Sequence, residues 1–166
     1  MLGMRFIKSQ PTTHLMQFRK GKVVREGAGQ SFFYYGPTST VVAVPVGSQD
    51  RPFILELVTV DFQSITVQGQ VTFRVTDPRR IASLMDFSLA PDGRGFTSED
   101  PQRLGERVAM QAEVIVRQTV QQMDLKQALR SSASIAQDCQ QRLASQAEVM
   151  ALGLEVLGVS VLAIKP

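Results

Sequence analysis

The stretch Ile65-Thr66-Val67-Gln68-Gly69-Gln70-Val71-Thr72-Phe73-Arg74-Val75-Thr76-Asp77-Pro78 decides the fold prediction for this chain of 166 residues. Apolar residues alternate with polar ones from Ile65 to Val75, which is typical of a β-strand with one face on a core and the other in water. The period changes at Asp77-Pro78, because aspartate caps helices and proline suits the first helical turn. The pattern therefore predicts a strand over residues 65–75 and a short helix over 79–86 that buries Ile81, Leu84 and Met85.

Upstream of this strand, extended runs are separated by turn residues, as in a β-sheet. Gly21 suits a hairpin turn between the first two runs, and a loop is predicted at residues 47–52. The predicted strands cover residues 14–18, 23–24, 31–35, 40–46 and 53–62.

Downstream, the apolar residues follow a helical period. A long helix beginning near Ser98 carries one stripe, formed by Leu104, Val108, Ala112, Ile115, Thr119 and Met123. Asp124 and Ser134 each have a glutamine three residues on, which predicts capping boxes for two further helices. The stripe continues through Ile135, Cys139, Leu143, Ala147 and Met150. Gly153 is placed to end it, and residues 154–164 return to extended character.

These elements predict one α+β domain over residues 1–166. We expect a mostly antiparallel twisted sheet in the strand-rich part, residues 14–75, with the helices of residues 78–152 packed to one side. The closing strand, residues 154–164, should return to the sheet.

The composition argues against catalysis. Cys139 and His14 are the only cysteine and the only histidine, so multi-cysteine and zinc sites lack ligands. Gly21-Lys22 is followed by valine, and Gly27-Ala28-Gly29 leads into a β-prone run, so neither motif predicts a nucleotide site. We therefore expect no catalytic residue, cofactor, metal, small-molecule substrate or nucleic-acid partner.

The best candidate surface lies near the N-terminus. Its basic residues, Arg5, Lys8, Arg19, Lys20, Lys22 and Arg25, all precede the first acidic residue, Glu26. The run Phe32-Phe33-Tyr34-Tyr35 fits sheet core and surface first, a membrane or partner contact second and nucleic-acid stacking third. No segment approaches the roughly 20 apolar residues that span a bilayer, and residues 1–8 do not form the apolar run of a signal peptide. We therefore expect a cytoplasmic domain that can lie at the periphery of a membrane.

The order of elements carries a resemblance over nearly the whole chain. Residues 21–33 pass from a Gly-Lys turn through Gly-x-Gly into an aromatic strand, and residues 60–78 form a long strand ending in Val-x-Asp-Pro. Residues 115–125 and 152–161 supply the matching helix and closing strand. In this order and spacing the chain resembles the SPFH or band 7 family of stomatins, prohibitins and flotillins.

The resemblance implies a non-catalytic scaffold that self-associates and organises membrane microdomains or regulates membrane-bound partner proteins. The alternative is a soluble, protein-binding regulatory module without lipid contact. Family members generally carry a membrane anchor and a long C-terminal coiled coil. We therefore expect either a domain excised from such a protein or a member that lacks those parts. This chain should be a monomer or weak oligomer, and the full-length protein a homo-oligomer.

Overall fold

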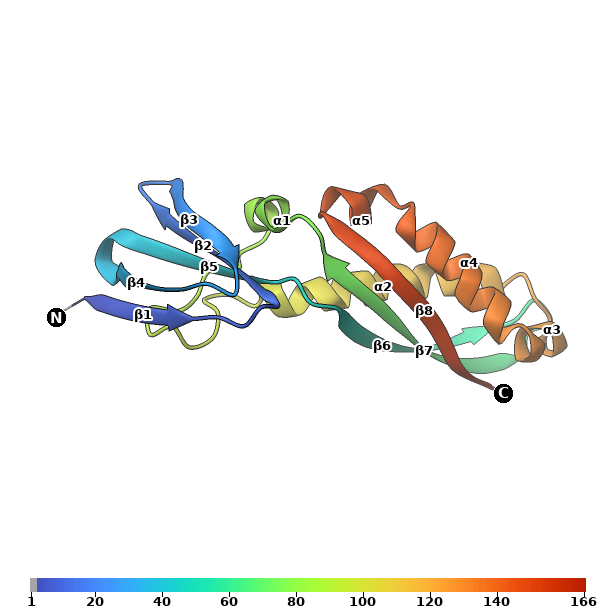
Figure 1. Ribbon diagram of the computed structural model, residues 1–166. Helices are drawn as coiled ribbons and strands as arrows, with labels where there is room; N and C mark the ends of the chain where they lie inside the picture. The colour runs from blue at the N-terminus through green and yellow to red at the C-terminus, as the bar shows by residue number, and fades with distance from the viewer. Residues whose placement is uncertain (1–2) are drawn as a thin grey trace. The chain divides into compact units, whose positions relative to one another are not determined.

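The computed structural model describes residues 3–166, and Figure 1 shows their helices and strands. The chain is α+β, with antiparallel sheets, five α-helices among the described residues and a closing C-terminal strand. Two compact units divide it: a first unit of Met1–Gly47 and Val75–Arg103, and a second unit of Ser48–Arg74 and Leu104–Pro166. The predicted fold class is confirmed, but the strands of residues 3–166 form three sheets, not one continuous sheet.

The first unit holds two of these sheets. An antiparallel ribbon pairs β1 with β4, and a second sheet has the order β3-β2-β5. A short 3-10 turn, Gly36–Thr38, joins β4 to β5. The strands are β1 (Met4–Lys8), β2 (Thr13–Arg19), β3 (Lys22–Ala28), β4 (Ser31–Tyr35) and β5 (Ser39–Pro45). Their core cluster consists of Leu15, Phe32, Tyr34, Val41 and Ala43, with Ile7 and Leu89 packed against it.

The turn between β2 and β3 confirms the predicted hairpin. Lys20 and Gly21 both have positive φ, at 53° and 75°. Two successive residues of this kind give a turn whose twist matches that of the flanking strands. Glycine adopts positive φ without the steric cost that other residues incur, which is why Gly21 indicates a turn in the sequence.

Helix α1 (Pro78–Leu84) begins where the sequence predicts. Asp77 accepts a hydrogen bond from the backbone N–H of Arg80 at 3.1 Å, which confirms the cap. Ile81 and Met85 are buried, but the predicted burial of Leu84 is wrong, since its side chain is 57% exposed. The helix ends at Leu84, and Met85 is already extended, with φ −137°. Met85 can therefore turn back to the core while Leu84 stays in water.

In the second unit, β6 (Gln49–Val58), β7 (Ser64–Val75) and β8 (Leu154–Lys165) form one sheet with β7 in the centre. The predicted loop at residues 47–52 is wrong from Gln49 onward, because β6 already pairs with β7 there. Its Pro52 is tolerated because β6 is an edge strand. The strand also ends earlier than predicted, at Val58, where Thr59 and Gln63 close a turn by a 2.9 Å backbone hydrogen bond.

The helices of the second unit are α2 (Asp100–Val120), which begins in the first unit, α3 (Leu125–Arg130), α4 (Ser132–Ala144) and α5 (Ala147–Ala151). Before α3, Asp124 and Gln127 form the predicted capping box, with hydrogen bonds of 2.8 and 3.1 Å. The capping box predicted at Ser134 is wrong, because α4 already begins two residues earlier and Ser134 lies inside it.

The predicted apolar stripes are confirmed for most of α2 and for α4. Leu104, Val108, Ala112 and Ile115 are buried on α2, as are Ile135, Cys139 and Leu143 on α4. The prediction fails at the end of the first stripe, because Thr119 is only half-buried and Met123 lies beyond α2, which ends at the buried Val120. The prediction fails for Ala147 and Met150, which are exposed, whereas Val149 is buried. The helix breaks at Ser145-Gln146, so the buried positions of α5 do not continue the helical spacing of those on α4. Gly153 follows it with φ 71°, as expected for the residue that ends a helix.

Gly69 sits at the centre of β7 and pairs directly with Phe53 of β6. A Cβ atom there would lie 2.3 Å from Cζ of Phe53 and 2.7 Å from the backbone oxygen of Ser160 on β8. The phenyl ring can adjust, but the backbone oxygen of a paired strand cannot. Position 69 therefore has no room for a side chain.

We predict that Gly69→Ala lowers the free energy of unfolding by about 1–3 kcal/mol, the usual cost of overpacking. Gly158→Ala on β8 is the matched control, since nothing lies within 4 Å of its added Cβ. Urea unfolding followed by circular dichroism measures both. Equal stability of the two variants would show that the sheet relaxes around position 69.

Candidate functional site

The β1–β4 ribbon sorts the aromatic run into two sets. The strands pair in antiparallel register, with Phe6 opposite Phe33 and Ile7 opposite Phe32. Successive side chains in a strand point to opposite faces. Phe32 and Tyr34 accordingly enter the core of the first unit, whereas Phe33 and Tyr35 point to solvent. Of the four predicted aromatic contact residues, only Phe33 and Tyr35 are exposed.

The solvent side of this ribbon is an apolar surface, which we call the ribbon face: Met4, Phe6, Phe33 and Tyr35. These side chains are 40%, 56%, 64% and 42% exposed. The rings of Phe6 and Phe33 have centroids 4.8 Å apart. Lys8 continues the same side of β1 toward Ser31. Four neighbouring large apolar side chains on one side of two paired strands form a patch of the kind that marks interaction sites.

The predicted basic residues are distributed over two sheets. Arg5 and Lys8 lie on β1, whereas Arg19, Lys20 and Lys22 gather at the β2–β3 turn. Arg25 lies on β3 with its guanidinium 4.7 Å from the centre of the Phe32 ring. All six are exposed, but only Lys8 shares the side of the ribbon that carries the ribbon face.

His14, the only histidine, takes part in a group of polar contacts that link elements of the fold. Its Nε2 lies 3.2 Å from Oε2 of Glu26 on the neighbouring strand. Arg79 of α1 donates from Nε to both oxygens of Glu26, at 2.8 and 3.1 Å, and from Nη2 to Oε1. The hydrogen bond from Arg79 is the main reason that the pKa of Glu26 is lowered. The contact ties α1 to β3.

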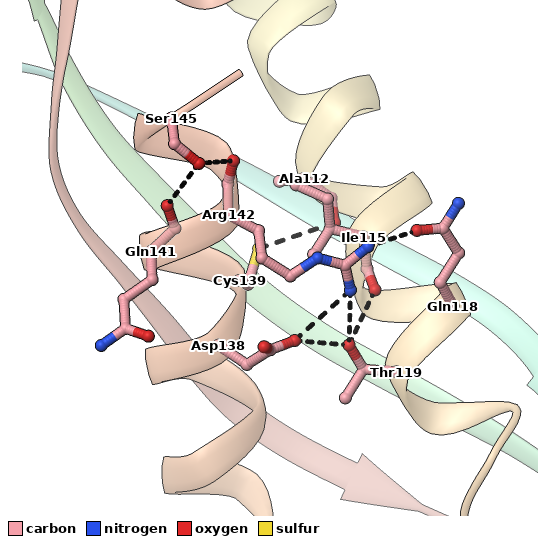
Figure 2. A network of polar contacts seen from close by, with 9 residues as sticks. All are labelled: Ala112, Ile115, Gln118, Thr119, Asp138, Cys139, Gln141, Arg142 and Ser145. Atoms are coloured by element: carbon pink, nitrogen blue, oxygen red, sulfur yellow. Dashed lines mark hydrogen bonds and ion pairs between the residues drawn. The ribbon is translucent and has the colours of Figure 1, made fainter.

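A second polar network joins α2 to α4 in the second unit (Figure 2). Thr119 donates to Asp138 at 2.7 Å, and Arg142 donates to Gln118 at 2.6 Å and to Thr119 at 3.3 Å. These groups line an open cavity of about 520 Å³. These hydrogen bonds link the two helices.

Cys139 lies beside this network, with Sγ 3.7 Å from the carbonyl oxygen of Ala112 (Figure 2). The pKa of its thiol is raised to about 11, mainly because the thiol is buried. The thiol therefore stays protonated at neutral pH, and only the thiolate is a nucleophile. This environment agrees with the place of Cys139 on the predicted apolar stripe.

Across residues 3–166, no three histidine, cysteine, aspartate or glutamate side chains gather in a way that could hold a metal ion. No helix in that range combines the length and the apolar character needed to cross a bilayer.

A family model for the SPFH domain / Band 7 family matches residues 7–166. The chain belongs to this family. No curated protein matches the chain significantly. The SPFH/Band 7 family is generally a membrane-associated scaffold or regulatory domain and is generally non-catalytic. The ribbon face is therefore the candidate site of this SPFH domain, since it offers apolar area and not reactive groups.

Sequence reasoning missed half of this face. Met4 and Phe6 belong to Met4-Arg5-Phe6-Ile7-Lys8, in which only Ile7 is partly buried. The two apolar residues Phe6 and Ile7 between Arg5 and Lys8 are a weak strand signal. What places Phe6 beside Phe33 is a pairing between segments 27 residues apart, and no local pattern encodes that pairing.

The Glu26 contact predicts a pH dependence of stability. Because the pKa of Glu26 is lowered from 4.5 in the folded protein, its ionised form stabilises the fold above that value, and this contribution is lost as the pH falls through the lowered pKa. Glu26→Gln should therefore lower the melting temperature at pH 7 by at most about 5 °C, since exposed ion pairs are weak. The difference from the wild type should shrink in acid.

Thermal melts from pH 7 to pH 3 check this prediction. Arg79→Gln should reproduce the loss, and the double variant should add little to either single change because both remove the same contact. Additive losses would contradict the pairing.

Proposed function

We propose that this SPFH domain is a non-catalytic scaffold that contacts a membrane surface through the ribbon face. The single observation that carries the proposal is the set Met4, Phe6, Phe33 and Tyr35, four exposed large apolar side chains on one side of a two-stranded ribbon. Aromatic side chains favour the boundary between lipid and water. The general association of the family with membranes supports the same choice of partner.

Charge supports an anionic membrane surface. Lys8 extends from the same side of the ribbon, and the exposed cluster Arg19, Lys20 and Lys22 lies at a hairpin turn of the same unit. Each lysine or arginine near an anionic bilayer contributes on the order of 1 kcal/mol. Apolar contact and charge attraction together would hold the domain at the surface while it organises microdomains or regulates membrane-bound partner proteins.

Self-association is the second part of the proposal. Strand β8 forms one edge of the β6-β7-β8 sheet, and its 12 residues contain no proline. An edge strand of this length offers backbone groups for pairing with another copy. In the full-length protein, such pairing would support a homo-oligomer on the membrane.

We predict that the chain co-sediments with vesicles that contain phosphatidylserine. Phe33→Ser and Phe6→Ser should each weaken this binding about tenfold, because burying a phenylalanine side chain contributes roughly 1.5–3 kcal/mol. Phe62→Ser is the matched control, since Phe62 is 87% exposed but lies in the β6–β7 turn of the second unit. Equal losses in all three variants would argue against the ribbon face. Absence of vesicle binding by the wild type would favour the soluble, protein-binding module.

For assembly, we expect a monomer with weak, concentration-dependent self-association at micromolar concentration. Contacts between single small domains that bury well under about 1,200 Å² are usually transient. Sedimentation velocity over a concentration series measures the distribution. A large, stable ring formed by these 166 residues alone would show that the domain itself drives assembly.

A further inference from the structure

A cavity of about 510 Å³ lies in the first unit, open to solvent on one side. Arg5 and Tyr34, which are direct cross-strand neighbours in the β1–β4 ribbon, line it. Because strand side chains alternate, both point away from the ribbon face. The start of β5 and residues 88–91 also line it, and a 2.8 Å hydrogen bond from the N–H of Leu89 to the oxygen of Val41 holds them together. The remaining lining residues are Gly3, Gly36, Pro37 and Thr97. The volume is that of a pocket for a small molecule.

Among the described residues, 3–166, Arg5 is the one charged residue that lines this cavity. Its side chain passes close to Gly36, because a Cβ atom added to Gly36 would lie 3.3 Å from Nε of Arg5. Within residues 3–166, no carboxylate lies at ion-pair distance from Arg5. A guanidinium carries up to five N–H donors in a planar fork, which suits carboxylate and phosphate oxygens. The cavity therefore offers an unneutralised cation at its wall.

The hydroxyl of Tyr34 supplies the second observation. Tyr34 is only 7% exposed, and its hydroxyl makes no hydrogen bond within the described part of the chain, residues 3–166. The hydroxyl oxygen is not one of the fully enclosed unpartnered atoms of these residues, so it keeps an accessible surface, and a partner can reach it from the cavity that Tyr34 lines. Ser39, also in the lining, accepts a hydrogen bond from Nε2 of Gln17 at 3.1 Å, so its own proton is available to a ligand. Arg5, Tyr34 and Ser39 thus provide donors of three kinds.

The hydroxyl of Thr97, also in the lining, is already engaged. It donates to Oδ2 of Asp86 at 3.2 Å, and the pKa of Asp86 is lowered mainly by hydrogen bonds from Ser88. Asp86 therefore stays ionised near neutral pH and holds the proton of Thr97. The groups that remain for a negative ligand are those of Arg5, Tyr34 and Ser39.

We infer that this cavity binds a phosphomonoester. A phosphomonoester carries about −1.5 to −2 charges at neutral pH and has three terminal oxygens. These oxygens can accept hydrogen bonds from the guanidinium of Arg5 and from the hydroxyls of Tyr34 and Ser39. The apolar side chains of Val41 and Leu89 in the lining would contact the organic part of the ester. The ligand is either a lipid headgroup or a soluble metabolite of the same chemistry. The inference does not rest on contact between the ribbon face and a membrane.

Calorimetric titration with glycerol 3-phosphate, together with co-sedimentation with vesicles of phosphatidylcholine containing phosphatidic acid, tests the inference. Tyr34→Phe removes only the unpartnered hydroxyl and should weaken binding about tenfold, the typical effect of a hydrogen bond to a charged group. Arg5→Gln should weaken it at least as much. Ser160→Ala is the control, because it removes an exposed hydroxyl on β8 of the second unit, away from the residues that line the cavity and from the ribbon face, and it should bind as the wild type does. Melting temperatures establish that each variant is folded.

The two probes separate the sources of the ligand. Binding of glycerol 3-phosphate that depends on Tyr34 indicates a soluble ester, whereas dependence on Tyr34 seen only with phosphatidic acid indicates a lipid headgroup; either result supports the site. Loss of vesicle binding in Phe33→Ser with unchanged binding of glycerol 3-phosphate would separate this site from the ribbon face. Equal binding by Tyr34→Phe and the wild type, equally tight binding of glycerate, or no binding of either probe would overturn the inference.

Discussion

The second unit depends on a position without a side chain. Gly69 lies in the middle of β7, and Phe53 of β6 fills the space on its inner side while the backbone of Ser160 on β8 approaches it closely. The three strands can pair at their normal spacing only because nothing projects from residue 69. Helix α4 then packs along β8, so the burial of its apolar stripe relies on a sheet whose centre is fixed by this contact.

Features encoded within a few residues could be predicted from the sequence. The alternation in β7, the cap at Asp77 and the capping box at Asp124 each involve neighbours in the chain, and the structure confirms all three. Predictions failed where the spacing of residues did not determine a helix boundary. Ser134 has the spacing of a cap but lies inside α4, and Ala147 and Met150 follow the spacing of the predicted stripe but come after the break between α4 and α5.

The candidate site could be predicted only in part. The aromatic run and the basic residues were visible, yet which rings point outward follows from the pairing of β4 with β1, which the sequence does not state. The cavity was wholly hidden from sequence analysis. Its lining comes mainly from β1, β4, β5, residues 88–91 and Thr97. In the sequence Arg5 is one of several scattered charges, and only the fold places it beside Tyr34.

Because side chains of β1 alternate between the cavity and the ribbon face, a change in the length of this strand affects both surfaces. Arg5 faces the cavity, while Met4 and Phe6 face outward, so the two sides of the ribbon share five consecutive residues. A side-chain period of two means that deleting one residue in this strand would exchange its two faces at once. Phe6 would then enter the cavity and the arginine would stand among the exposed rings. Substitutions can alter either side separately, whereas insertions and deletions in β1 necessarily alter both.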